Sequence, residues 1–200
     1  MEKVASVQIE KWKGKEIAPY INDIALLRTL YFHDYPYFYV ANIQSEKAYA
    51  EALSQNEKGF LGLLKEGGII QGAITGVPFK DAPEMFSGAF LENNLSLDKI
   101  FFLREIMLHK AFQGHGYGTK LVKTFEEFAR SNGYQKIVVS EVQENQNDLR
   151  CPAGYVSIER FWETMGFERV PGVTAYCLWK EIGTETEVSH PMFFMQKTLN

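Results

Sequence analysis

The sequence has few of the residues that build disulfide frameworks or metal sites. It contains only two cysteines, Cys151 and Cys177, which lie far apart and form no Cys-x-x-Cys pattern. Its four histidines show none of the spacings that are typical of metal ligands. We therefore expect two reduced thiols, no structural disulfide and no bound metal.

Long basic runs and long apolar runs are also missing from the sequence. The sequence has no long basic run and its formal net charge is −4, which disfavours nucleic-acid binding because phosphate contacts need a basic face. No segment approaches the ~20 apolar residues that cross a bilayer. The first six residues lack the apolar stretch of a signal peptide. These absences predict a cytoplasmic protein with no nucleic-acid or membrane partner.

The sequence does have enough apolar material for a folded core. Of its 200 residues, 46% are hydrophobic and 14% aromatic. A chain of this length buries roughly 70% of its unfolded surface, so it needs no covalent staples. We predict one domain over residues 1–200.

Apolar periodicity and turn residues predict an alternation of helices and strands. Helical spacing is found in five segments: 19–31, a segment capped by Ser45, 84–91, 117–131 and a segment capped by Ser157. Apolar runs typical of strands cover 60–64 and 69–77, joined by a glycine turn, then 99–108, 137–142, 174–182 and 192–199. Because a helical crossover returns the chain in the same direction, the strands around the 117–131 helix must be parallel. The fold class is mixed α/β, with a single, mostly antiparallel sheet of six to seven strands flanked by helices.

A glycine-rich turn separates the 99–108 strand from the 117–131 helix. It consists of Gln113, Gly114, His115, Gly116, Tyr117, Gly118 and Thr119. Glycines let the backbone turn tightly and approach a ligand, and the following helix directs unpaired N–H groups and partial positive charge into the same space. This geometry suits a pyrophosphate. A plain turn between strand and helix is the alternative interpretation.

The pattern Gln-x-x-Gly-x-Gly at Gln113, Gly116 and Gly118 resembles the acetyl-CoA signature of the GNAT acetyltransferases. Three further segments resemble family features in the same order, namely the fourth strand, a helix end and the last strand, at 103–110, 161–167 and 191–199. The resemblance implies the GNAT fold and transfer of an acetyl group from acetyl-CoA to a primary amine of a small molecule or protein. It also divides the domain into an acceptor side, an acetyl-CoA-binding core, and a final helix with strands, at 1–80, 99–142 and 155–200.

In this family two parallel strands splay apart at a bulge, and the pantetheine arm of CoA lies in the gap. By position, main-chain donors to that arm would come from Met107 and Leu108. The family's asparagine contact to the arm could be made by Asn145 or Asn147. The aromatic residues of 33–39 could line the acceptor pocket or belong to the core.

An attacking amine needs a base, because an alkyl ammonium group has a pKa of about 10.4. Glu105 is the first candidate, since a charge in so apolar a strand is costly without a partner or a water-filled cleft. The alternative for Glu105 is a salt bridge with Arg104 or with a lysine of a neighbouring strand. Glu141, at the end of the next strand, is the second candidate, or else an exposed strand-end carboxylate.

One position departs from the family pattern. Many members carry a tyrosine that protonates the departing CoA thiolate where this sequence has Trp162, and an indole N–H is not a usable acid. Tyr155 or water could replace that tyrosine, although Tyr155 could also serve packing alone.

Two other functions remain open. A dinucleotide-binding oxidoreductase would use Gly114, Gly116 and Glu141, but the third glycine of its motif is replaced by Thr119 and too little chain remains for a doubly wound sheet. A non-catalytic acyl-CoA-binding or regulatory module on the same fold would not need the missing tyrosine. An exposed edge of the last strand also makes a homodimer plausible.

Overall fold

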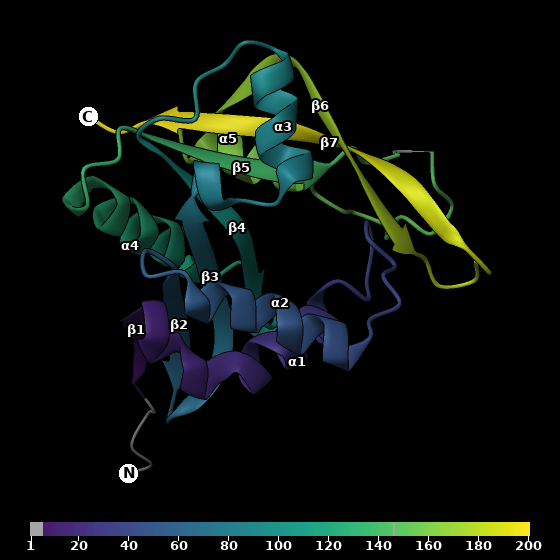
Figure 1. The fold of residues 1–200 in the computed structure, drawn as a ribbon. Helices are drawn as coiled ribbons and strands as arrows, with labels where there is room; N and C mark the ends of the chain where they lie inside the picture. Colours follow the sequence, from purple (N-terminus) through teal and green to yellow (C-terminus); the bar gives the residue numbers. More distant parts are fainter. Residues whose placement is uncertain (1–5, 146) are drawn as a thin grey trace.

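The computed structural model describes residues 6–145 and 147–200 and contains one seven-stranded sheet with the strand order β1-β2-β3-β4-β5-β7-β6 (Figure 1). The strands are β1 (Val7–Lys13), β2 (Phe60–Glu66), β3 (Ile69–Pro78), β4 (Ile100–Leu108), β5 (Lys136–Val142), β6 (Glu168–Lys180) and β7 (Glu187–Thr198). Only β4 and β5 pair in parallel, and every other neighbouring pair is antiparallel. The predicted fold class is confirmed.

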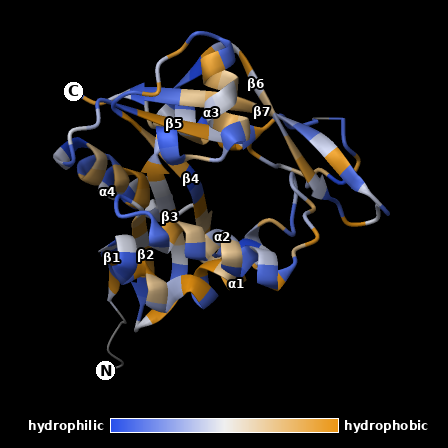
Figure 2. Cartoon of the chain, in the orientation of Figure 1, coloured by the Kyte–Doolittle hydropathy of each residue, from blue (hydrophilic) through white to orange (hydrophobic). Residues whose placement is uncertain are grey.

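Helices cover both faces of this sheet, and each face has its own core. One face carries α1 (Ile21–Tyr31), α2 (Ile43–Gln55) and α3 (Glu84–Glu92), whose buried residues share a core with the β3–β5 strands. The other face carries α4 (Tyr117–Ser131) and α5 (Ile158–Thr164). Short 3₁₀ turns at Gly14–Tyr20, Phe79–Asp81 and Lys110–Phe112 link these elements. In Figure 2, α4 carries both colours of the hydropathy scale, as an amphipathic helix should.

The parallel pairing of β4 with β5 ends well before either strand does. Register partners run from Ile100 with Lys136 to Leu103 with Val139, and none follows. Both strands continue beyond that point, β4 to Leu108 and β5 to Val142. The two strands therefore diverge at their carboxyl ends and leave a gap in the middle of the sheet, as Figure 1 shows for β4 and β5.

A β-bulge in β4 lies where the gap begins. Thr75 of β3 pairs with Glu105, and the next residue, Gly76, pairs with Leu103, so Arg104 is left without a partner. An extra residue resets the alternation of side chains along a strand. As a result Arg104 and Glu105 both reach residues of the α1–α2 face, where Arg104 contacts Tyr49 and Glu105 contacts Arg28.

Most of the sequence-based elements are present, with three corrections. The strand β1 was not predicted, because its alternating half-buried pattern carries charged residues on the exposed side. The N-cap of α2 is Asn42, whose side chain accepts from the N–H groups of Gln44 and Ser45, so the proposed cap at Ser45 is wrong. The last two strands begin several residues earlier than predicted, at Glu168 and Glu187. Ser157 does cap α5 by accepting from the Glu159 N–H.

Within the described residues, no helix combines the length and the hydropathy that crossing a bilayer would need.

Candidate functional site

The glycine turn before α4 presents a row of free main-chain donors. None of the N–H groups from Gly114 to Thr119 has an acceptor among the described residues. Gly114 and Gly116 adopt the left-handed region, with φ of 74° and 79°, and open space surrounds the position of a Cβ atom at either residue. The turn is exposed, and α4 directs its positive end into it. These donors fit an anion such as a pyrophosphate.

The side chain of Gln113 is used to shape this turn. Its Nε2 donates to the Leu108 carbonyl oxygen at 2.9 Å, which ties the start of the turn to the end of β4. The His115 ring lies back on the same turn, with Nδ1 2.7 Å from the Gln113 carbonyl oxygen. Both side chains therefore bond to nearby backbone carbonyls, and the free donors of the turn are its main-chain N–H groups.

The β4 edge of the gap offers further main-chain donors, but of the expected pair, Met107 and Leu108, only Leu108 is among them. The His109 N–H donates to the Gln71 carbonyl oxygen of the β3 side. Because N–H directions alternate along an antiparallel ladder, the Met107 N–H faces β3 as well, whereas those of Ile106 and Leu108 face the gap. The register thus replaces Met107 with Ile106 as a gap-facing donor.

A cavity of about 300 Å³ opens on the α1–α3 face at the same place. Both arms of the gap contribute to its wall, with Arg104, Glu105 and Ile106 from β4 and Ser140 and Glu141 from β5. Most of the remaining wall is aromatic, including Tyr31, Phe32, Tyr37, Tyr39, Phe86 and Trp179. Within the predicted 33–39 cluster, Tyr37 and Tyr39 line the cavity.

Glu141 is buried in this wall without a basic partner among the described residues. Its Oε1 accepts from the Trp162 indole N–H at 2.8 Å, and its Oε2 accepts from the Tyr37 hydroxyl at 2.9 Å. Burial raises the pKa of the Glu141 carboxyl to about 7, although both hydrogen bonds act to lower it. A carboxyl group with that pKa can exchange a proton near neutral pH.

Glu105 is buried too, but it is tied to a cation. It forms an ion pair with Arg28 of α1 and accepts from the Thr75 hydroxyl at 3.1 Å. Arg28 also pairs with Glu46 of α2 at 2.5 Å. Glu105 therefore does form a salt bridge, as the alternative interpretation of the sequence held, but its partner lies on a helix 77 residues earlier in the chain and is neither Arg104 nor a lysine.

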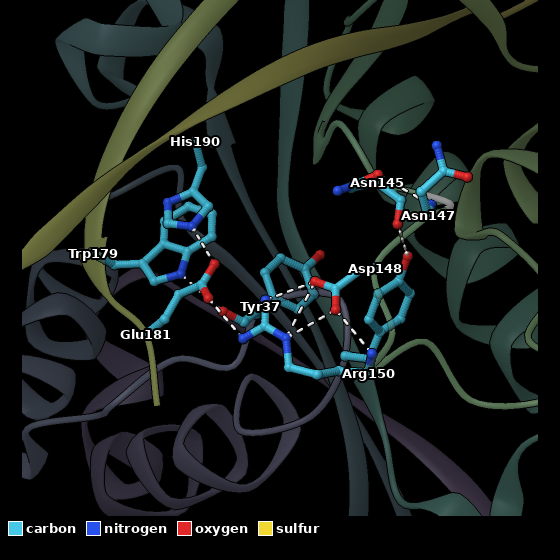
Figure 3. A network of polar contacts seen from close by, with 9 residues as sticks. Tyr37, Asn145, Asn147, Asp148, Arg150, Trp179, Glu181 and His190 are labelled. Atoms are coloured by element: carbon cyan, nitrogen blue, oxygen red, sulfur yellow. Dashed lines mark hydrogen bonds and ion pairs between the residues drawn. The ribbon is translucent and has the colours of Figure 1, made fainter. Parts of the chain in front are cut away.

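Tyr155 lies outside the cavity wall. Its hydroxyl donates to Glu144 at 2.8 Å, and its ring packs edge-on against Tyr35, with the ring centroids 4.7 Å apart. Burial and the bond to Glu144 raise the pKa of the phenol. The Asn145 carbonyl oxygen accepts from the Tyr35 hydroxyl at 3.3 Å, and its side chain accepts from the Asn147 N–H at 3.1 Å (Figure 3). In this structure Asn145 and Asn147 therefore form hydrogen bonds that shape the loop after β5.

That loop is fastened to the cavity wall by a polar network (Figure 3). Arg150 pairs with Asp148 at 2.6 Å and with Glu181 at 2.9 Å, and Glu181 also bonds the His190 ring at 2.8 Å. His190 stacks on Trp179, whose indole N–H donates to the Tyr37 carbonyl oxygen at 2.9 Å. The network holds Tyr37 in place, and Tyr37 is one of the two hydrogen-bond donors to Glu141.

Three side chains of the site were not predicted from the sequence: Arg28, Tyr49 and Arg104 as a cavity residue. Tyr37 lies in the aromatic segment that was singled out, so composition did give a signal for it. The others stand in ordinary helix or strand patterns. Among the described residues no group of three or more histidine, cysteine or acidic side chains could hold a metal.

Comparisons with known proteins agree with this architecture. The profile described as "Acetyltransferase (GNAT) family" matches residues 24–167. No curated protein matches the chain by sequence. Solved structures match at low identity and show the shared fold. An N-acetyltransferase from Staphylococcus aureus Mu50 has a TM-score of 0.59 and 14% identity, covering 98% of this chain and 100% of its own.

Two further structures are similar over almost the whole chain. A ribosomal-protein-alanine N-acetyltransferase from Brucella melitensis has a TM-score of 0.57 and 15% identity, with 96% of this chain and 99% of its own covered. The protein yncA from Salmonella typhimurium, solved with its cofactor acetyl-CoA, has a TM-score of 0.58 and 17% identity, with 98% and 95% covered.

Proposed function

Since the chain belongs to the GNAT family of acetyltransferases, we propose that it moves the acetyl group of acetyl-CoA to a primary amine held in the cavity. The observation that carries this proposal is Glu141, a buried carboxyl with a pKa of about 7 at the point where β4 and β5 separate. A proton acceptor at that point is what direct attack by an amine on a thioester in the gap requires.

The residues present fit acetyl-CoA. The main-chain N–H groups of Gly114–Thr119 would hold the pyrophosphate, and those of Ile106 and Leu108 would hold the pantetheine arm and polarise the thioester carbonyl. When bound, acetyl-CoA supplies an activated acyl group. The Gln113 side chain supports the turn through Leu108 and needs no contact with the ligand.

We assign the general-base role to Glu141 rather than to Glu105. An amine that arrives protonated must lose a proton before it attacks, and Glu141 can take that proton directly or through water. Tyr37 and Trp162 each donate to one Glu141 oxygen and fix the carboxylate in the wall. Glu105 is neutralised by Arg28, so its charge serves the architecture of the wall.

Trp162 stands where many family members have a tyrosine, and we assign it a different role. Its N–H orients Glu141, and it supplies no proton to the thiolate. The Tyr155 proton is directed at Glu144, away from the cavity wall, so we assign protonation of the departing thiolate to water rather than to Tyr155.

An acceptor screen tests the proposal. Primary amines of varied size and charge are incubated with the protein and acetyl-CoA, and release of free thiol is followed. We expect turnover with at least one amine and its loss in Glu141→Gln, while CoA affinity measured by calorimetry is retained. Glu127→Gln, which removes an exposed carboxylate on α4, is the matched control. CoA binding that is lost together with turnover would contradict the assigned role of Glu141.

The second candidate function is a non-catalytic acyl-CoA-binding module, and the observation that favours it is Trp162 at the position of the usual acid. Such a module would bind CoA through Gly114–Thr119 with the same affinity in wild type and Glu141→Gln. It would release no thiol with any amine beyond spontaneous hydrolysis. The same screen therefore separates the two functions.

A further inference from the structure

The cavity wall contains two arginines in very different electrostatic situations. Arg28 pairs with both Glu46 and Glu105, so its charge is more than compensated. Arg104 has no carboxylate within ion-pair distance among the described residues. Within the part of the chain that the structure describes, its side-chain hydrogen bonds go to Tyr49, through Nε to the hydroxyl at 3.1 Å and Nη2 to the carbonyl oxygen at 3.2 Å. Arg104 is the arginine of the wall that can take an anionic partner.

Tyr49 separates these two charges. The guanidinium carbons of Arg28 and Arg104 each lie 3.8 Å from the centroid of its ring. Two guanidinium groups at that distance over one face would overlap, so the ring lies between them and keeps Arg104 apart from the acidic partners of Arg28. Burial would raise the pKa of Tyr49, yet the two arginines lower it, which indicates a positive field on this side of the cavity.

The Arg104 side chain is held with donors to spare. A guanidinium carries five N–H groups, and the contacts to Tyr49 use two of them. The bulge in β4 aims the side chain at the α1–α2 face, and stacking on Tyr49 fixes its plane. A planar, oriented guanidinium with free donors on a concave surface is suited to bind a carboxylate with two hydrogen bonds.

We propose that Arg104 binds the carboxylate of the acceptor, and that the acceptors are small amino acids or amino-acid-like amines with an apolar or aromatic side chain. This proposal rests on the proposed function and names its substrate class. The cavity volume of about 300 Å³ matches a ligand of that size, and its aromatic wall matches the side chain. Arg104 and Glu141 line the same cavity from opposite arms of the gap, so in the proposed orientation the carboxylate lies on the Arg104 side and the amine on the Glu141 side.

Matched pairs of acceptors test the inference. Each α-amino acid with an apolar or aromatic side chain is compared with its decarboxylated amine, for example phenylalanine with phenethylamine, by thiol release from acetyl-CoA. We expect the wild-type protein to favour the carboxylated member of the best pair by about 10- to 100-fold in kcat/KM, which is the range for a charge-assisted hydrogen-bonded contact.

The variant Arg104→Met should lose this preference through KM for the acid, with the amine changed less than about threefold. Arg104→Lys keeps the charge without the planar fork and should recover part of the preference. Tyr49→Phe removes the hydroxyl that Nε contacts, so it should raise KM for the acid while kcat is retained. The control Lys58→Met removes an exposed positive charge outside the cavity and should change neither member of a pair.

A binding arm keeps this test separate from that of the proposed function. Calorimetry on the CoA-loaded protein measures N-acetylated amino acids against the N-acetylated amines, with wild type and Arg104→Met, and needs no turnover. Tighter binding of the acids that is lost in Arg104→Met supports the role of Arg104 even if no amine is acetylated. Equal binding of acid and amine, no binding of either, or an equal loss of both in Arg104→Met would overturn the inference. Thiol release only with carboxylate-free amines would overturn it while the proposed function stands.

Discussion

The two arms of the gap carry one glutamate each, equally buried, and they differ in what surrounds them. Glu105 on β4 and Glu141 on β5 are both 6% exposed. Glu105 meets the cation of Arg28, whereas Glu141 meets only the neutral donors of Tyr37 and Trp162. Burial next to a cation favours the charged form, and burial without one favours the neutral form. The partner therefore decides whether a buried carboxylate can carry a proton at neutral pH.

We expect the largest effect on kcat when each of the two carboxylates is replaced in turn by an amide. Glu141→Gln should lower kcat by about 10²- to 10⁴-fold, the usual contribution of a general base, with CoA affinity retained. Glu105→Gln should lower kcat much less in the fraction of protein that remains folded. Steady-state kinetics with the best acceptor of the screen measure both. A larger loss for Glu105→Gln would reverse the comparison.

For the free energy of unfolding we expect the opposite result: a change in the surroundings of Glu105 should cost more than a change at Glu141. Removing Arg28 with Arg28→Met leaves Glu46 and Glu105 as buried carboxylates without their cation, and it should cost about 3–5 kcal/mol in urea unfolding. Glu141→Gln keeps the volume and removes a carboxyl that is costly to ionise, so it should be neutral or stabilising at pH 8. A mild effect of Arg28→Met, comparable to that of an exposed control such as Lys58→Met, would show that the ion pair does not hold the wall.

Stability should also depend on pH in a direction that identifies Glu141. Its pKa is raised from 4.5 to about 7 in the folded protein, so the folded state binds the proton more tightly than the unfolded state does. The contribution is therefore fully present below about pH 4.5 and is lost as pH rises through 7, amounting to about 3 kcal/mol. Subtracting the unfolding curves of Glu141→Gln from those of wild type isolates it. A difference that does not fall between pH 5 and 8 would exclude the raised pKa.

The smallest effect should be a shift in the pH midpoint of activity. The rate kcat/KM should rise through about pH 7 as Glu141 loses its proton. Tyr37→Phe and Trp162→Phe each remove a hydrogen bond that lowers this pKa, so each should move the midpoint to higher pH by about one unit or less. Tyr39→Phe is the matched control, because its hydroxyl donates to Glu46 at 2.6 Å instead. An equal shift in the control would attribute the effect to general loosening of the wall.

The contrast between the two arms also shows which features of the site could be predicted from the sequence. The glycine turn and α4 were predicted residue by residue, because the donors at Gly114–Thr119 come from the backbone and their geometry follows from local order. Both glutamates were identified as candidates from their place in apolar strands. The sequence ranked Glu105 first, and we propose the reverse order from contacts that the sequence does not contain: the partner of Glu105 lies on α1, and one donor to Glu141 follows that helix in the chain.

The sequence by itself determined the order of the helices and strands after β1, the parallel crossover and the glycine turn before α4, because these depend on apolar periodicity and on glycine positions that are close together in the chain. Only the tertiary structure decided which amides face the gap, which carboxylate is neutralised and which arginine is left free. Those outcomes depend on strand register, on one bulge at Arg104 and on contacts between segments far apart in the chain. The strength of an electrostatic interaction in a buried wall depends on the distance between such segments, and a linear pattern does not contain those distances.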